Sequence, residues 1–355
     1  MTDRMKSPVY REDLDRVLVD ADPASFLGGK TLLVTGATGL LGTFLCDVLS
    51  EANERGANIR LIAVGRDAAR AKDRFGYSIG SPLFTFVEHD VRVPFPEDLS
   101  FDFAIGGASL THPVAYAKHP LETILTNVEG TRNLLDSAAR CRAKVLFLSS
   151  VEVYGNSRDG QPFREDDTGA LDLSTARAGY TESKRVSEAL CQAYAAEKNL
   201  DVRIARLCRV FGPTVLPTDT KASSQFLFKA AAGRDIVLKS AGEQQFSYLH
   251  VSDAVSAILA ILKAGHSGTA YNAASPDCDV RLRDFAERAA ATAGTRVVFD
   301  FPPETERRGY SIASTAILDA SRLRALGWTP RLGFNEAVQR TVDVLRFLLE
   351  NDSLP

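Results

Sequence analysis

Three residues stand out by type and spacing. Tyr180 and Lys184 lie four residues apart in YTESK, so a helix would place the phenol and the ammonium on one face. Tyrosine alone is a poor base at neutral pH, since its unperturbed pKa is ~10, but a neighbouring cation favours the phenolate. Ser150 ends the strand pattern VLFLSS, where its hydroxyl could bond to the same substrate oxygen. These three residues predict a site in which the Tyr180 phenolate takes the proton of a substrate hydroxyl while a hydride leaves the carbon that carries this hydroxyl.

A glycine-rich turn supplies a place for the hydride acceptor. It runs from Gly36 to Gly42 as GATGLLG, between the β-branched strand KTLLVTG and the amphipathic helix LLGTFLCDVLSEAN. Where β-carbons are missing, backbone amides can approach a pyrophosphate at the positive end of a helix. The turn therefore predicts dinucleotide binding. Its expected contacts are Gly36, Thr38, Gly39, Leu40, Leu41 and Gly42.

The end of the second strand bears on which dinucleotide binds. An acid there would bond to the adenosine ribose hydroxyls of NAD, but the sequence reads Val64-Gly65-Arg66-Asp67. Gly65 leaves space and Arg66 offers a planar cationic fork for a 2′-phosphate, which favours NADP over NAD. We expect Asp67 to cap the following helix.

From Lys30 onward, strands and helices alternate as far as Arg206. That alternation predicts an α/β fold with a doubly wound parallel sheet. The third strand should present Asp90 and Val91 to the adenine, and the fourth should let the cofactor pass at Gly107, Ala108 and Ser109. We expect an N-terminal extension at 1–28, a nucleotide-binding domain at 29–210 to which 236–276 return, and a smaller substrate-binding lobe at 211–235 and 277–350.

Composition excludes several other classes of protein. The net charge is −3 without a dense Lys/Arg run, so nothing points to nucleic acid. No stretch approaches the ~20 apolar residues that span a bilayer, so we expect no membrane insertion. The five cysteines are scattered without metal-ligand spacing, which favours reduced thiols in a cytoplasmic protein and no metal.

From about Lys30 to Arg346 the sequence resembles the extended short-chain dehydrogenases that modify nucleotide sugars, such as dTDP-glucose 4,6-dehydratases and UDP-glucuronate decarboxylases. The resemblance rests on TGATGLLG, HDV, TNVEGTRNLL, LSSVEVYG, YTESK, RLCRVFGP, YLHVSDAV, YNAAS and LDASRLRALGW. It implies a Rossmann-type fold and a catalytic triad of Ser150, Tyr180 and Lys184. By the same resemblance Asn127, Tyr180 and Lys184 belong to the cofactor-binding active site, and Glu152 holds the place of an acid/base.

Three positions depart from the pattern of that family. Val151 stands where the dehydratases carry an aspartic acid that protonates the leaving hydroxyl, and an apolar side chain cannot do this. Phe246 takes the place of an arginine that in relatives contacts the diphosphate and helps the decarboxylases handle their substrate. Arg209 replaces a usual asparagine and could contact the diphosphate from another direction.

The resulting hypothesis is NAD(P)-dependent oxidation at C4 of a nucleotide-diphosphate sugar, in an enzyme of the epimerase/dehydratase type. Glu152 favours removal of a proton beside the new ketone, whereas Val151 and Phe246 favour epimerisation. The alternatives are an NADPH-dependent 4-ketoreductase, a UDP-glucuronate decarboxylase-like enzyme and a non-catalytic dinucleotide sensor. The expected substrate contacts are His112, Arg209 and Gln225.

The resemblance also implies a homodimer. The helices around Leu121 to Arg140 and Tyr180 to Lys198 carry apolar stripes that in the family form a four-helix interface. The alternative is that both stripes face only the sheet.

Overall fold

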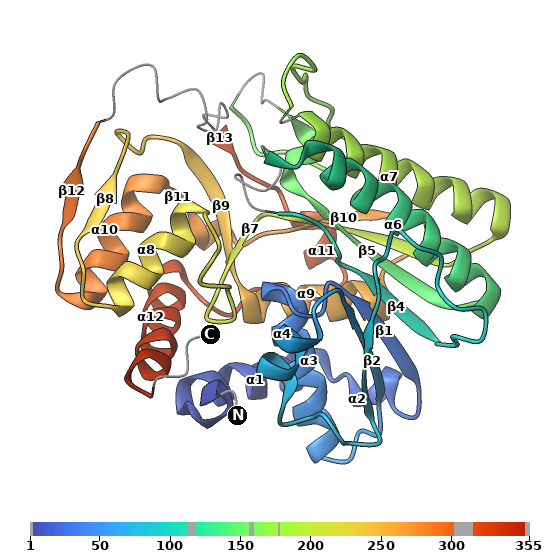
Figure 1. Cartoon of the computed structure of the whole chain (residues 1–355). Helices are drawn as coiled ribbons and strands as arrows, with labels where there is room; N and C mark the ends of the chain where they lie inside the picture. Colours follow the sequence, from blue (N-terminus) through green and yellow to red (C-terminus); the bar gives the residue numbers. More distant parts are fainter. Residues whose placement is uncertain (1–2, 112–117, 156–159, 177, 302–314, 352–355) are drawn as a thin grey trace.

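The computed structural model describes the chain apart from residues 1–2, 112–117, 156–159, 177, 302–314 and 352–355. Its central feature is a seven-stranded parallel sheet in the order β10-β6-β5-β4-β1-β2-β3 (Figure 1). The strands are β1 (Thr31–Thr35), β2 (Arg60–Gly65), β3 (Phe84–Glu88), β4 (Phe103–Gly106), β5 (Lys144–Ser150), β6 (Val202–Leu207) and β10 (Ala270–Ala273).

The strand order sets the position of the site. β1 lies between β2 and β4, so the chain proceeds outward from β1 in opposite directions. In such sheets a ligand crevice forms beyond the carboxyl ends of the strands, where the order reverses. Both faces of the sheet are covered: Leu32 and Val34 belong to one buried core and Leu33 to another, as the alternation of side chains along a strand requires.

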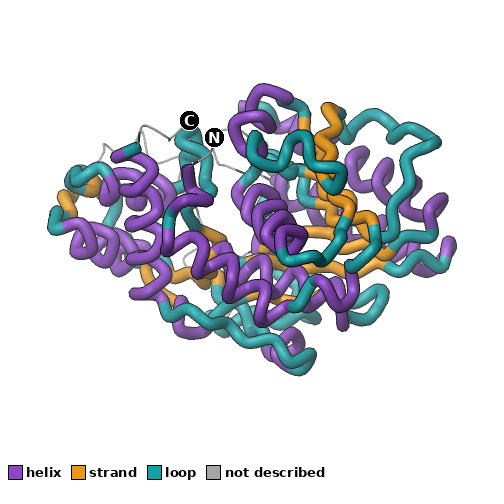
Figure 2. The backbone as a smooth tube through the Cα atoms, turned by 90° about the horizontal axis from the view of Figure 1, so that it is seen from below, coloured by secondary structure: helices purple, strands orange, loops and turns teal. Residues whose placement is uncertain are grey.

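Helices form a layer on each face of the sheet (Figure 2). On one face α3 packs against α9, and on the other α6 packs along α7. The N-terminal extension contains α1, which packs against both α3 and α9. The bounds are η1 (Asp3–Lys6), α1 (Pro8–Ala21), α2 (Ala24–Leu27), α3 (Leu40–Glu54), α4 (Ala68–Phe75), α6 (Pro120–Cys141), η2 (Val151–Tyr154), α7 (Ala178–Lys198) and α9 (Val251–Ala264).

The second lobe is built from short strands and three helices that pack together (Figure 1). β9 pairs with β7, β11 and β13, and β8 pairs with β12. The elements are β7 (Arg209–Phe211), α8 (Ala222–Ala231), β8 (Ile236–Leu238), β9 (Gln245–His250), η3 (Pro276–Cys278), β11 (Asp279–Arg281), α10 (Leu282–Ala293), β12 (Val297–Phe299), β13 (Thr315–Ala316) and α12 (Phe334–Glu350). α11 (Ser321–Arg324), which we expected in this lobe, packs instead against β10 of the large sheet.

The segment that returns to the large sheet is shorter than expected. α9 and β10 return, but β8 and β9, which we also expected within 236–276, pair with strands of the second lobe. The cause is an aromatic core: Phe285 of α10 contacts Phe211 and Tyr248 at ring-centroid distances of 5.1 and 4.8 Å. These contacts hold β7 and β9 against α10 of the lobe.

Among the residues described, no helix is both long enough and apolar enough to cross a bilayer.

Candidate active site

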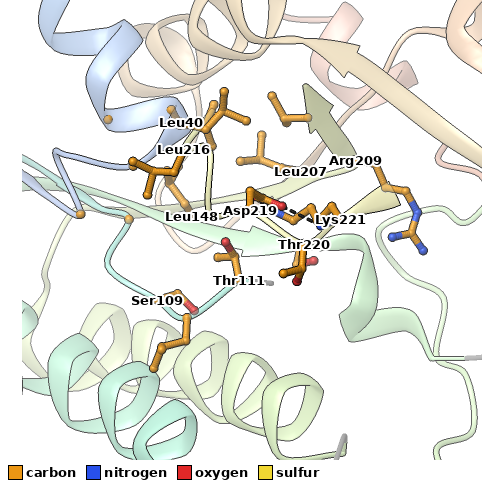
Figure 3. A pocket seen from close by; sticks show the side chains of 18 of the residues that line it. Leu40, Ser109, Thr111, Leu148, Leu207, Arg209, Leu216, Asp219, Thr220 and Lys221 are labelled. Carbon is orange, nitrogen blue, oxygen red and sulfur yellow. Dashed lines mark hydrogen bonds and ion pairs between the residues drawn. The ribbon is translucent and has the colours of Figure 1, made fainter. Parts of the chain in front are cut away.

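A cavity of about 970 Å³ lies at the carboxyl edge of the large sheet and is lined by residues of both lobes. In Figure 3, Leu40 and Leu216 point into it from one side, and Ser109 and Thr111 from the other. A cavity of this size, mostly apolar with a few polar groups, is typical of a small-molecule site.

The glycine-rich turn forms one end of the cavity. Gly36 has a φ of 71°, and a β-carbon there would lie 2.6 Å from the Gly107 carbonyl oxygen. A β-carbon at Gly42 would overlap the Gly36 carbonyl oxygen. The N-cap of α3 is Gly39, which has no side chain to bond to the amides of the first turn. Those amides can therefore bind an anion, and the turn fits a dinucleotide pyrophosphate.

The edge beyond β2 carries a cation. Arg66 lines the cavity, and its Nη1 lies 2.6 Å from an oxygen of Glu122 in the first turn of α6. Asp67 caps α4 as expected, because its carboxylate accepts the Arg70 amide at 2.8 Å. Asp90 also lines the cavity, where hydrogen bonds from Arg92 lower its pKa to about 2. Its carboxylate therefore stays charged throughout the physiological range.

Ser150, Tyr180 and Lys184 line the same cavity, as the sequence predicted. Ser150 ends β5, and its Oγ accepts the Glu152 amide at 3.3 Å where η2 begins. The Lys184 ammonium donates to the Leu148 carbonyl at 2.8 Å, and burial lowers its pKa to about 8. The Lys184 ammonium thus meets the end of β5, and Tyr180 lines the same cavity as the glycine-rich turn.

Glu152 lies in the cavity wall beside a cation. An oxygen of its carboxylate is 3.7 Å from Nη2 of Arg209. The Arg209 guanidinium stacks over the buried Phe246 ring, 3.8 Å from its centroid. Two departures from the family pattern, at 209 and 246, therefore form one cation–π contact.

Two buried hydroxyls support a polar ligand at the cofactor end. Ser109 Oγ and Thr126 Oγ1 line the cavity and have no hydrogen-bond partner among the described residues. Buried polar groups in proteins are normally bonded, so a ligand with donors and acceptors fits here. Gly107 and Ala108 line the adjacent wall.

One predicted residue lies behind the cavity and not in its wall. Asn127 does not line the cavity; its Nδ2 donates to Ser183 Oγ at 2.8 Å and so links α6 to α7 behind the site. His112 falls outside the described residues.

The substrate side carries lysines that sequence reasoning missed. Gln225 lines the cavity and donates to the Asp219 carbonyl at 2.5 Å, and Lys221 pairs with the Asp219 carboxylate at 3.1 Å (Figure 3). Lys229 and Lys239 line the same wall. Their only sequence signal was a position within or after the irregular segment FGPTVLPTDTKASS. In the described part of the chain no cluster of three or more His, Cys, Asp or Glu residues could hold a metal.

Known proteins resemble the chain over most of its length. UDP-glucuronic acid decarboxylase 1 of Danio rerio is 28% identical, over 93% of this chain and 77% of its own. A dTDP-glucose 4,6-dehydratase of Bacillus anthracis, solved with NAD, has a TM-score of 0.75 at 20% identity and covers 90% of this chain and 98% of its own. A UDP-glucose 4-epimerase of Thermotoga maritima, solved with UDP-glucose, has a TM-score of 0.76 at 20% identity and covers 90% and 99%.

The chain also matches a known protein family. Residues 32–274, which run from β1 through β10 of the large sheet, match the NAD dependent epimerase/dehydratase family. The chain therefore belongs to this family, and it is an enzyme of the extended short-chain dehydrogenase type that its motifs indicate.

Proposed function

We propose that the enzyme oxidises C4 of a nucleotide-diphosphate sugar with a bound NAD(P)+. The observation that carries the proposal is the convergence of Ser150, Tyr180 and Lys184 on one cavity with the glycine-rich turn. The sugar nucleotides in the names of the relatives support the substrate class.

Each residue has a defined part in this mechanism. The Tyr180 phenolate accepts the proton of the C4 hydroxyl, and Ser150 orients the same oxygen. The Lys184 ammonium favours the phenolate and binds the nicotinamide ribose. The bound dinucleotide supplies the hydride acceptor.

The fate of the ketone depends on Glu152. Its carboxylate lines the cavity close to Ser150, where it can remove a proton from the carbon beside the new ketone. If the C6 hydroxyl then left as water, return of the hydride from the bound dinucleotide to C6 would give a 4-keto-6-deoxy sugar, whereas reprotonation of C5 on its other face followed by hydride return to C4 would give a C5 epimer. Without proton removal, hydride return to the other face of C4 would give a C4 epimer. An enzyme that bound NADPH and a keto sugar would instead act as a 4-ketoreductase.

A second candidate is a decarboxylase-like enzyme that acts on a nucleotide uronate. The observation that favours it is Arg209, whose Nε and Nη2 are buried without a hydrogen-bond partner among the described residues. A guanidinium fork of this kind binds a carboxylate in a bidentate manner. Arg209 therefore offsets the loss of the family's arginine at Phe246, which had weakened the decarboxylase reading. The names of the UDP-glucuronic acid decarboxylase relatives agree with this candidate.

We also propose NADP as the preferred cofactor. Gly65, Arg66 and Arg70 line the end of the cavity beyond β2, where an adenosine ribose would bind. A 2′-phosphate would compete with Glu122 for Arg66, and a phosphate with two charges and three acceptor oxygens is the stronger ligand.

The test of the function is a spectroscopic assay. The purified protein is mixed with NAD+ or NADP+ and, in turn, with UDP-glucose, dTDP-glucose and UDP-glucuronate, and the absorbance of reduced nicotinamide is followed together with the products. We expect reduction, or turnover to a new sugar, with at least one of the three. Tyr180→Phe is the matched control that keeps the ring and removes the base. Thermal protection by the cofactor without reaction on any sugar would favour the dinucleotide-sensing alternative.

A further inference from the structure

Behind the candidate catalytic residues, a helix face meets the end of a strand in register. Tyr180, Lys184 and Glu188 follow one another at intervals of four residues along α7, so they share one face. Opposite them β5 ends with residues 148–150, the last of which is the candidate catalytic serine. Glu188 does not line the cavity, and so it acts from behind the site.

Two hydrogen bonds fix this register. The Lys184 ammonium donates to the Leu148 carbonyl at 2.8 Å, and the Ser149 hydroxyl donates to Glu188 Oε1 at 2.5 Å. Consecutive residues of the strand therefore hold consecutive turns of the helix, and the next residue of the strand is Ser150. A shift of α7 along β5 would break both bonds and move Lys184 away from the site.

A cation from the neighbouring strand holds Glu188 in place. Arg206 of β6 donates to both Glu188 oxygens, with Nε at 3.0 Å and Nη2 at 2.7 Å. The same guanidinium donates to the Tyr154 hydroxyl at 2.9 Å and the Glu165 carbonyl at 2.7 Å. The side chains of Glu188 and Arg206 are only 11% and 14% exposed. A buried pair of this kind is costly to break from one side, so the carboxylate has little freedom.

The charge of Glu188 also acts on Lys184. Burial lowers the pKa of Lys184, and the negative charge of Glu188 one turn away opposes that change. α6 contributes the uncharged Thr126 and Asn127 to this region. The groups around the ammonium are the Leu148 carbonyl and the Phe147 ring of β5, Cys191 and Glu188 of α7, and Arg206 of β6 on the far side of Glu188.

We propose that Glu188 is a positioning residue, which holds the Lys184 ammonium in register with Ser150 and supplies a negative charge beside it. The proposal rests on the proposed function, in which Lys184 binds the nicotinamide ribose. It goes beyond that function by assigning a role to a residue outside the cavity.

The test compares cofactor binding across pH in four proteins. They are the wild type, Glu188→Gln, the double variant Glu188→Gln/Arg206→Gln and the control Glu182→Gln, which removes an exposed acid of the same helix. Affinity for NADPH and NADH is measured from nicotinamide fluorescence between pH 6 and about 10, with the hydride-transfer rate as a second readout. In the wild type the affinity should fall as pH rises through about 8, because the buried ammonium then loses its proton.

In Glu188→Gln the fall should begin about one pH unit lower, because the opposing negative charge is gone. The double variant separates the two roles of Glu188, since it removes the buried pair as a whole and leaves no unpaired cation. If it keeps the shifted pH profile, Glu188 acts on Lys184. If it regains the wild-type profile, Glu188 is only the counter-ion of Arg206 and the proposal is wrong. A shift of equal size in Glu182→Gln would also overturn it. These titrations need no sugar, so a failure to find a sugar substrate would count against the proposed function alone.

Discussion

The guanidinium of Arg209 lies 3.8 Å from the centroid of the Phe246 ring and 3.7 Å from the nearest carboxylate oxygen of Glu152. The aromatic face stabilises the cation on one side and leaves its edge toward the cavity. The positive charge thus comes from β7, while β9 contributes the apolar surface beneath it.

Replacement of Arg209 should reveal which substrate anion it binds. We expect Arg209→Ala to raise the KM of the preferred sugar nucleotide about tenfold to a hundredfold, the loss of about 1.5–3 kcal/mol for a charged hydrogen-bonded contact. If the ligand is a sugar carboxylate, thermal protection by UDP-glucuronate should fall while protection by UDP does not. Equal losses for both would assign Arg209 to the diphosphate. Arg234→Ala, an exposed arginine outside the cavity, is the control and should change neither.

The contact between Arg209 and Phe246 also marks what the sequence could not predict. The two positions are far apart in the chain, and from the sequence each was a separate departure from the family pattern. Strand pairing between β7 and β9 brings them together. The alternation from β1 to β6 was predictable because it depends on local hydrophobic patterns, whereas side-chain pairs across strands depend on a register that no local pattern contains.

The sequence also could not predict the partner of Arg66 or the short strands of the second lobe, because these too depend on residues far apart in the chain. The Gly65-Arg66 pair was visible as a possible phosphate site, but the competing Glu122 lies 56 residues further on. In the second lobe β8 and β12 are three residues each and pair across a long separation, so neither carries a strong strand signal. Tyr180 and Lys184 were recognisable as candidates because YTESK keeps the phenol and the ammonium within about one helical turn.

Arg66→Ala should weaken NADP binding and hardly change NAD binding. A lost bidentate phosphate contact is worth about 1.5–3 kcal/mol, or roughly tenfold to a hundredfold in Kd. Isothermal titration with both cofactors measures this directly. Glu122→Gln is the complementary variant: it releases Arg66 and should strengthen NADP binding. Equal losses for NADP and NAD in Arg66→Ala would show that Arg66 does not recognise a 2′-phosphate.

Asp47→Asn should destabilise the fold strongly. Asp47 is buried in α3 and accepts two bonds from the buried Arg4, at 2.6 and 2.8 Å, and one each from the Tyr10 and Tyr77 hydroxyls. Removal of its charge leaves Arg4 buried without an anion, which typically costs about 3–5 kcal/mol in the free energy of unfolding. Chemical denaturation of the variant and the wild type measures this difference in the free energy of unfolding.

Arg55→Met is the matched control for Asp47→Asn. Arg55 follows α3 and pairs with Asp15 of α1 and Glu51 of α3, and its side chain is 47% exposed. Exposed pairs contribute about 0–1 kcal/mol. A loss as large as that of Asp47→Asn would mean that the burial of the Arg4 pair is not what stabilises this contact.

We predict that the chain forms a homodimer through α6 and α7. Leu121, Ile124 and Val186 are exposed on these helices at 67%, 36% and 45%, although they are large and apolar. A second copy that covers them would bury this surface. Light scattering at micromolar concentration should give the mass of a dimer, and Leu121→Asp/Val186→Asp should give the mass of a monomer. A monomeric mass for the wild type would show that both helices pack only against their own sheet.

Glu152 separates the remaining reactions. If it removes the C5 proton after oxidation at C4, turnover in deuterium oxide should place deuterium at C5, because the carboxylate exchanges its proton with solvent. Simple C4 epimerisation leaves C5 untouched. Glu152→Gln keeps the shape of the side chain and removes its basicity. General-base catalysis typically contributes about 100-fold to 10,000-fold, so overall turnover should fall by that factor while the first hydride transfer survives.

Reduced cofactor should then accumulate in Glu152→Gln, which stopped-flow absorbance measures in a single turnover. The neighbouring Arg209 calls for a second comparison, because loss of the Glu152 charge also removes its ion pair. Glu152→Asp keeps that charge and moves the base, so it should slow turnover without changing substrate affinity. If Glu152→Gln stays as active as the wild type and the product contains no deuterium from solvent, Glu152 serves only to pair with Arg209. That outcome would rule out proton removal at C5 and favour the C4-epimerase and ketoreductase hypotheses.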